Sequence, residues 1–217
     1  MRFCALAILS GLLTFVGFIS AAMVLYPGGN WIDRAAPGHR FFANFLCDLT
    51  QPVSLSGVNN QNAAFCAQLG MLCFAASLAA FFWLLPRHFA ARARLASWVR
   101  GLGECAVLCL VAVSLMPSEH FGMLHARLAL TAGALGLSAA LCAVVGLAGS
   151  QPRLALLGGL VMLTCAFDGV LFVYHLGDVT PPPLIIPAAQ KLAALLLCLW
   201  MIGVAGLSLR PGSSSGA

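Results

Sequence analysis

Charged residues are scarce in this sequence. Only 8% of its 217 residues are Asp, Glu, Lys or Arg, whereas 61% are hydrophobic. A soluble domain has roughly 25% charged residues and could not bury so large a share of apolar side chains. The composition therefore excludes an ordinary water-soluble enzyme and predicts a protein of the lipid bilayer.

Several metal and nucleotide motifs are also absent. The chain has no CxxC pair, no HExxH and no Gly-rich phosphate-binding loop. Most of the nine cysteines lie inside apolar runs, where a small side chain packs between helices. Cys47 and Cys66 lie on the side of the membrane that is predicted below to face away from the cytoplasm, and they could form a disulfide if that compartment is oxidising.

Six long apolar runs fill the chain. A hydrocarbon core about 30 Å thick requires about 20 apolar residues per helix. The runs predict helices over residues 4–26, 63–85, 97–116, 122–147, 154–176 and 188–209. We predict an all-α membrane protein with a single six-helix transmembrane bundle over residues 1–209 and a disordered tail at 210–217. The first run resembles a signal peptide, but its length favours a retained helix.

Basic residues predict the orientation, because Lys and Arg near helix ends are retained in the cytoplasm. In this topology seven lie at the end that carries the termini, namely Arg2, Arg87, Arg92, Arg94, Arg100, Arg153 and Arg210. Four lie toward the opposite end, namely Arg34, Arg40, Arg127 and Lys191. Both termini are predicted to be cytoplasmic, and the net charge of +5 reflects this orientation rather than a nucleic-acid partner.

Polar side chains concentrate at the outer side. The first outer loop, residues 27–62, mixes aromatic, charged and amide side chains, and we expect it to fold over the bundle. Its segment HRFFANFLCDL predicts a short interfacial helix. Lys191 is expected to extend toward the outer headgroups. The candidate outer polar site consists of Asp48, Glu119, His120, His125, Arg127, Asp168, His175 and Lys191.

Asp168 needs an explanation because it lies within an apolar run. A charged carboxylate near the bilayer centre costs about 2.5 to 3.5 kcal/mol, so a partner is expected. Arg127 enters the predicted helix over residues 122–147 from the same side and lies at a comparable depth, so an Asp168–Arg127 ion pair is the simplest prediction. Alternatively, His125, Asp168 and His175 bind Zn²⁺, with one position left for water. Near the inner side, Glu104 is expected to pair with Arg100 four residues away.

Two stretches resemble a known family. NFLCDLTQP at 44–52 and MPSEHFGMLHARLAL at 116–130 are similar to the bacterial membrane family called domain of unknown function 998, and more remotely to DRAM-like membrane proteins. Asp48, Pro117, Glu119 and His125 take the places of its motif residues, whereas Cys47 and Thr50 replace a usual Ser and Gly. The resemblance implies a six-helix protein of the bacterial cytoplasmic (inner) membrane and brings no established activity.

Three functions follow from these observations. We expect first an outward-facing polar site that binds a membrane lipid or a membrane-protein partner, because aromatic and polar residues share the outer loop. A zinc-dependent hydrolase of a lipid amide or ester at the membrane interface is the alternative. A small proton-linked transporter built around Asp168 and Arg127 is the third.

Overall fold

Six long helices form the protein. The computed structural model describes residues 1–176 and 183–210, so the predicted disordered tail lies, apart from Arg210, outside the described residues. The long helices are α1 (Arg2–Leu25), α2 (Gln61–Leu84), α3 (Ala93–Leu115), α5 (Met123–Leu147), α6 (Pro152–His175) and α7 (Ile185–Leu209). Each is long and apolar enough to cross a membrane. The predicted all-α, six-helix membrane fold is confirmed, and the predicted helix boundaries differ by at most four residues.

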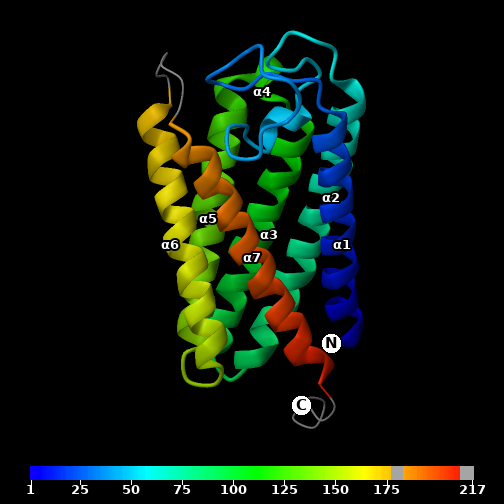
Figure 1. The fold of residues 1–217 in the computed structure, drawn as a ribbon. Coiled ribbons are helices and arrows are strands. Elements are labelled where there is room, and N and C mark those ends of the chain that lie inside the picture. Colours follow the sequence, from blue (N-terminus) through cyan, green and yellow to red (C-terminus); the bar gives the residue numbers. More distant parts are fainter. Residues whose placement is uncertain (177–182, 211–217) are drawn as a thin grey trace.

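The helices are arranged side by side in a closed ring. Contacts run from α1 to α2, α3, α5, α6 and α7 in turn, and α7 returns to α1 and α2 (Figure 1). The N-terminus and the C-terminal end of α7 lie at the same end of the bundle (Figure 1). We call this end the inner end and the opposite end the outer end.

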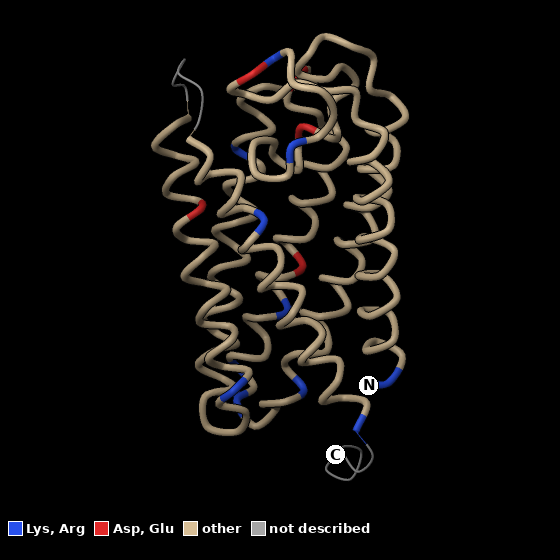
Figure 2. Tube along the Cα trace, in the orientation of Figure 1, with Lys and Arg blue, Asp and Glu red and all other residues tan. Residues whose placement is uncertain are grey.

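Charge is distributed unequally along the bundle. Figure 2 shows basic residues gathered near the inner end, whereas acidic residues lie mostly toward the outer half. Lys and Arg are retained in the cytoplasm more readily than they are translocated. The arrangement of charge in space therefore agrees with the predicted orientation.

Glycines allow close approach of aromatic rings in the inner half. A Cβ atom at Gly103 of α3 would lie 2.3 Å from the ring of Phe82, and one at Gly158 of α6 would lie 2.6 Å from the ring of Trp200. Trp200 is almost completely buried, and its ring centroid lies 5.1 Å from that of Phe81. Lipid provides no hydrophobic drive between helices, so such tight contacts carry the packing.

Residues 26–60 fold over the outer end, and we call this segment the cap. It contains the 3₁₀ helix η1 (Cys47–Thr50), and isolated β-bridges join Gly28 to Pro37 and Val53 to Asn59. The short helix α4 (Ser118–Phe121) lies beside it, between α3 and α5 (Figure 1). At the inner end, the 3₁₀ helix η2 (Leu85–Phe89) follows α2 directly.

The predicted interfacial helix over residues 39–49 is wrong. Residues 41–43 and 46 form turns, and η1 begins within the segment at Cys47. The physical reason lies in Asn44, whose side-chain oxygen accepts a hydrogen bond from the backbone N–H of Arg40 at 2.9 Å. Asn side chains compete in this way with the helical hydrogen-bond pattern. The prediction that the loop folds over the bundle is confirmed (Figure 1).

Candidate functional site

Asp48 is the centre of the cap. The residue is 3% exposed, and its carboxylate accepts three hydrogen bonds. One oxygen accepts from the indole N–H of Trp31 at 3.2 Å. The other accepts from the backbone N–H of Phe45 at 2.8 Å and from the side-chain amide of Asn44 at 3.3 Å. Because all three partners are donors, the site is built for an acceptor-only group.

Burial perturbs several titratable groups in the cap, among them Asp48 and His39. It raises the pKa of Asp48 to about 6, against the opposing effects of its hydrogen bonds and of the Lys191 charge. It lowers the pKa of His39 to about 4, and the Lys191 charge acts in the same direction. Burial disfavours the charged form of either group, which explains the opposite signs. The cap therefore holds an acid and a base whose pKa values are displaced from their ordinary values.

Lys191 fastens the cap to α7. Its ammonium donates to the backbone carbonyl of Asn44 and, at 3.3 Å, to that of Pro187 one turn earlier. The ammonium also lies 5.2 Å from the ring centroid of Phe41. Lys191 is only 7% exposed, so the prediction that it extends to the headgroups is wrong. The Asn44 carbonyl oxygen of the cap accepts the hydrogen bond that the Lys191 ammonium would otherwise make with lipid headgroups or water.

A neighbouring residue adds a second attachment to the same helix. The side-chain oxygen of Gln190 accepts a hydrogen bond from the backbone N–H of Leu46 at 2.9 Å. Two consecutive residues of α7 thus bind the backbone of one cap turn. This turn cannot move away from α7 without breaking both contacts.

Gln51 joins the cap to α4. Its amide nitrogen donates to the Ser118 hydroxyl at 2.7 Å and to the Cys47 carbonyl at 3.2 Å. Its amide oxygen accepts from the backbone N–H of Glu119 at 2.9 Å. Ser118 and Glu119 belong to the second of the two stretches that carry the family resemblance, and Gln51 to the first. The two stretches therefore meet in space through one buried side chain.

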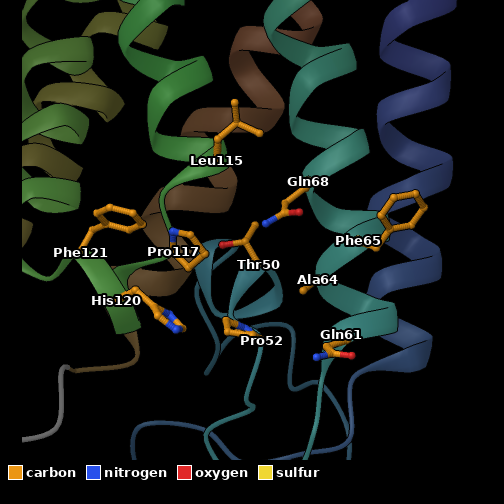
Figure 3. A pocket seen from close by; sticks show the side chains of 10 residues that line it. All are labelled: Thr50, Pro52, Gln61, Ala64, Phe65, Gln68, Leu115, Pro117, His120 and Phe121. Atoms are coloured by element: carbon orange, nitrogen blue, oxygen red, sulfur yellow. The ribbon is translucent and has the colours of Figure 1, made fainter.

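An open groove of about 400 Å³ lies next to this junction, between the outer ends of α2 and α3 and the short helix α4 (Figure 3). Helices α2 and α3 touch closely in the inner half through Phe82 and Gly103 and leave room farther out. The polar lining residues are Thr50, Gln61, Gln68 and His120, and the apolar ones are Pro52, Ala64, Phe65, Leu115, Pro117 and Phe121.

The predicted outer histidines and Glu119 lie in different surroundings. His120 lines the groove and is exposed, as is the Glu119 side chain beside it. His125 is 6% exposed, and its Nδ1 lies 2.6 Å from the carbonyl oxygen of Met116. His175 ends α6, with its ring 5.3 Å from that of Tyr174. His125 thus connects α5 to the end of α3 rather than facing the groove.

The predicted ion pair between Asp168 and Arg127 is not formed. Arg127 is exposed on the outer surface of α5, whereas Asp168 is partly buried on α6. Among the described residues these two side chains have neither a hydrogen bond nor an ion pair with each other. The basic group whose charge acts on Asp168 is Lys191 of α7. The two residues lie at similar depth, but similar depth alone does not bring two side chains into contact.

The predicted zinc site is not assembled in the part of the chain that the structure describes. No three His, Cys, Asp or Glu side chains come together there in a way that could hold a metal ion, so His125, Asp168 and His175 do not converge. Cys47 and Cys66 are free thiols, so the predicted disulfide is absent as well. Both predictions were based on residues that lie toward the same end of the membrane spans. A common position along the membrane does not by itself bring side chains into contact.

Sequence reasoning missed the amides that build the site. Asn44 and Gln51 organise the cap, and Gln61 and Gln68 line the groove. A signal for the second pair was present, because two glutamines seven residues apart lie on one face of an apolar helix. Comparison with protein-family models, curated proteins and solved structures found no match to this chain.

Proposed function

We propose that the protein binds an amphipathic membrane lipid with an uncharged polar headgroup in the groove between α2, α3 and α4. The observation that carries this proposal is the composition of the groove, which combines a polar and an apolar set of side chains at one end of the membrane spans. A lipid presents the same two chemistries, joined at the level where headgroups meet acyl chains.

The apolar set suits an acyl chain. Phe65, Leu115 and Phe121 are all exposed on the surface of the protein and border the groove. Gln68 lies seven residues below the start of α2, about 10 Å at about 1.5 Å per residue. The groove therefore extends from the interface into the outer leaflet, where acyl chains begin.

The polar set suits hydroxyl or amide groups. The lining residues include no Lys, Arg, Asp or Glu. Phosphate headgroups are typically bound by Arg or Lys through charge-assisted hydrogen bonds. Amides, a hydroxyl and an imidazole instead offer both donors and acceptors to neutral partners. This chemistry favours a diacylglycerol-like or ceramide-like lipid over an anionic phospholipid.

The cap holds one side of the groove in place. Thr50 and Pro52 flank Gln51, and its contacts to Ser118 and Glu119 position Pro117 and His120. In the orientation given by the basic residues, the groove faces away from the cytoplasm. With the family resemblance, this supports a multi-pass protein of the bacterial cytoplasmic membrane that binds lipid from the outer leaflet.

Photocrosslinking in nanodiscs tests the proposal. The protein is reconstituted in phosphatidylcholine nanodiscs that contain a diacylglycerol with a diazirine in one acyl chain, and labelled peptides are mapped by mass spectrometry. We expect labelling concentrated on the outer turns of α2 and on α4. Gln68→Leu should reduce it about fivefold, because one lost hydrogen bond is worth about 1 kcal/mol.

Two controls make the result decisive. Ser138→Leu changes an exposed polar residue of α5 outside the groove and should leave the labelling unchanged. A phosphatidylglycerol probe with the same diazirine should label the groove less than the neutral lipid. Uniform labelling around all six long helices would refute a specific site, and preferential labelling by phosphatidylglycerol would refute the neutral headgroup.

A further inference from the structure

We infer that Glu104 is a proton-binding carboxyl group in the middle of the membrane, at a site separate from the groove. Glu104 lies eleven residues from either end of α3, which runs from Ala93 to Leu115. At about 1.5 Å per residue this is about 16 Å from both ends. The carboxyl group therefore lies near the centre of the hydrocarbon core and not at the inner interface.

The partner that the sequence predicts for Glu104 is engaged elsewhere. The Arg100 guanidinium lies over the ring of Trp83, 5.1 Å from its centroid. Within the described part of the chain Glu104 makes no side-chain hydrogen bond and no ion pair. Asp48 and Asp168 differ in this respect, because the Lys191 charge acts on both.

The surroundings of α3 provide no charge at the depth of Glu104. The elements packed against α3 are α2, α5 and η2. Their titratable or charged side chains are Cys66 and Cys73 of α2, Arg87 and His88 of η2, and His125, Arg127 and Cys142 of α5. The charged members of this set lie at the inner end or in the first two turns of α5, at least about two helical turns from the middle of the bundle.

A proton is the remaining way to neutralise this group. A carboxylate in hydrocarbon is strongly disfavoured, whereas the neutral acid is tolerated. Glu104 is partly buried and shares a face of α3 with Leu115 of the groove, three turns farther out. A protonated acid at this place can exchange its proton when water or a cation reaches the α2–α3 boundary, which is the property of an intramembrane proton site.

Labelling with a hydrophobic carbodiimide tests this inference on the whole protein in nanodiscs. Dicyclohexylcarbodiimide enters the bilayer and reacts with protonated carboxyl groups there, because the acid O–H adds across a C=N bond and the adduct rearranges to a stable N-acylurea. We expect the adduct on Glu104, with labelling at pH 6 about tenfold faster than at pH 9. Glu104→Gln should abolish it, whereas Glu119→Gln, which changes an exposed carboxyl outside the spans, should not.

Site mapping in the wild-type protein decides the question even if a variant fails to fold. Labelling confined to Asp168, or no label on Glu104, would overturn the inference. An Arg100→Gln variant addresses the predicted ion pair. If Glu104 were charged and paired, it would react only after this substitution, whereas equal labelling with and without Arg100 supports the protonated acid. A protonated carboxyl band in the infrared spectrum that disappears in Glu104→Gln would support it independently.

Discussion

The cap and the inner half of the bundle are held together by opposite chemistry. In the described part of the chain, seven of the twelve buried polar residues belong to the cap, namely Asn30, Asn44, Asp48, Thr50, Gln51, Ser54 and Asn60. The inner half instead places aromatic rings against glycines, as in the Trp200–Gly158 and Phe82–Gly103 contacts. Directional hydrogen bonds dominate in the cap, and close packing dominates in the inner half of the bundle.

The two regions should therefore lose stability in different ways when residues are substituted. A hydrogen-bonded cap is damaged when one partner is removed, because the other partner remains buried without a bond. A closely packed helix contact is damaged when a group is added, because neighbouring side chains have no space to yield. Substitutions of each kind test whether hydrogen bonds determine the stability of the cap and close packing that of the inner half.

The largest effect is expected from added volume in the inner half. Gly158→Leu should destabilise the protein by about 3 kcal/mol, because a Cβ there would lie 2.6 Å from the Trp200 ring and 2.9 Å from Val144. Gly159→Leu is the matched control, since nothing lies within 4 Å of a Cβ at that position. Thermal unfolding in detergent compares the two. Equal stability of both variants would show that this contact is not tight.

The Asp48 carboxylate gives the next largest effect. Asp48→Asn should cost about 2 kcal/mol, because an amide nitrogen would face a donor at whichever oxygen it replaces. Asp33→Asn in the same cap is the control, since the exposed Asp33 side chain accepts a hydrogen bond from the backbone N–H of Ala35, which an Asn oxygen can also accept. The same unfolding assay applies. If Asp33→Asn were equally destabilising, the three donors around Asp48 would not explain the loss of stability in Asp48→Asn.

The helices could be predicted from the sequence because the bilayer sets their length. Six apolar runs longer than about 20 residues leave few alternatives, and backbone hydrogen bonds must be satisfied within each span. The contacts between helices could not be predicted in the same way. Asp168 and Arg127 lie at similar depth, but depth does not give the rotation of α5 that leaves Arg127 exposed.

The candidate site was only partly predictable for the same reason. Asp48 and His120 were identified because polar groups are rare in this chain. The role of Lys191 depends on a cap carbonyl 147 residues away, that of Asn44, which no local pattern reveals. Gln51 likewise acquires its role through Ser118, 67 residues away. Long-range pairing of this kind depends on the folded cap.

A smaller effect is expected where the cap meets α4. Gln51→Ala removes the hydrogen bonds to Ser118 and Glu119, which lie near the surface where water can replace them, so the cost should be about 1 kcal/mol. Hydrogen exchange of the Glu119 amide is the sensitive measurement, and it should become faster. Gln61→Ala, at an exposed residue across the groove, should not change this exchange. An unchanged Glu119 amide in Gln51→Ala would contradict the proposed attachment.

The smallest effect concerns the pH dependence of stability and separates the contributions of His39 and Asp48 in the cap. His39 has a folded-state pKa of about 4, below its ordinary value of 6.5, so the stability it contributes is present above pH 6.5 and is lost as the pH falls toward 4. Asp48, with a pKa raised to about 6, contributes stability at low pH that is lost as the pH rises through 6.

The contributions of His39 and Asp48 to the pH dependence of stability have opposite signs. The stability of the wild-type protein alone would therefore change little with pH. The difference between wild type and His39→Gln isolates the histidine, and we expect the wild type to lose about 1 kcal/mol more than the variant between pH 6.5 and pH 4, a small value because the ring is partly exposed. Thermal unfolding at a series of pH values measures it. Parallel curves for the two proteins would mean that burial of His39 in the cap does not disfavour its charged form.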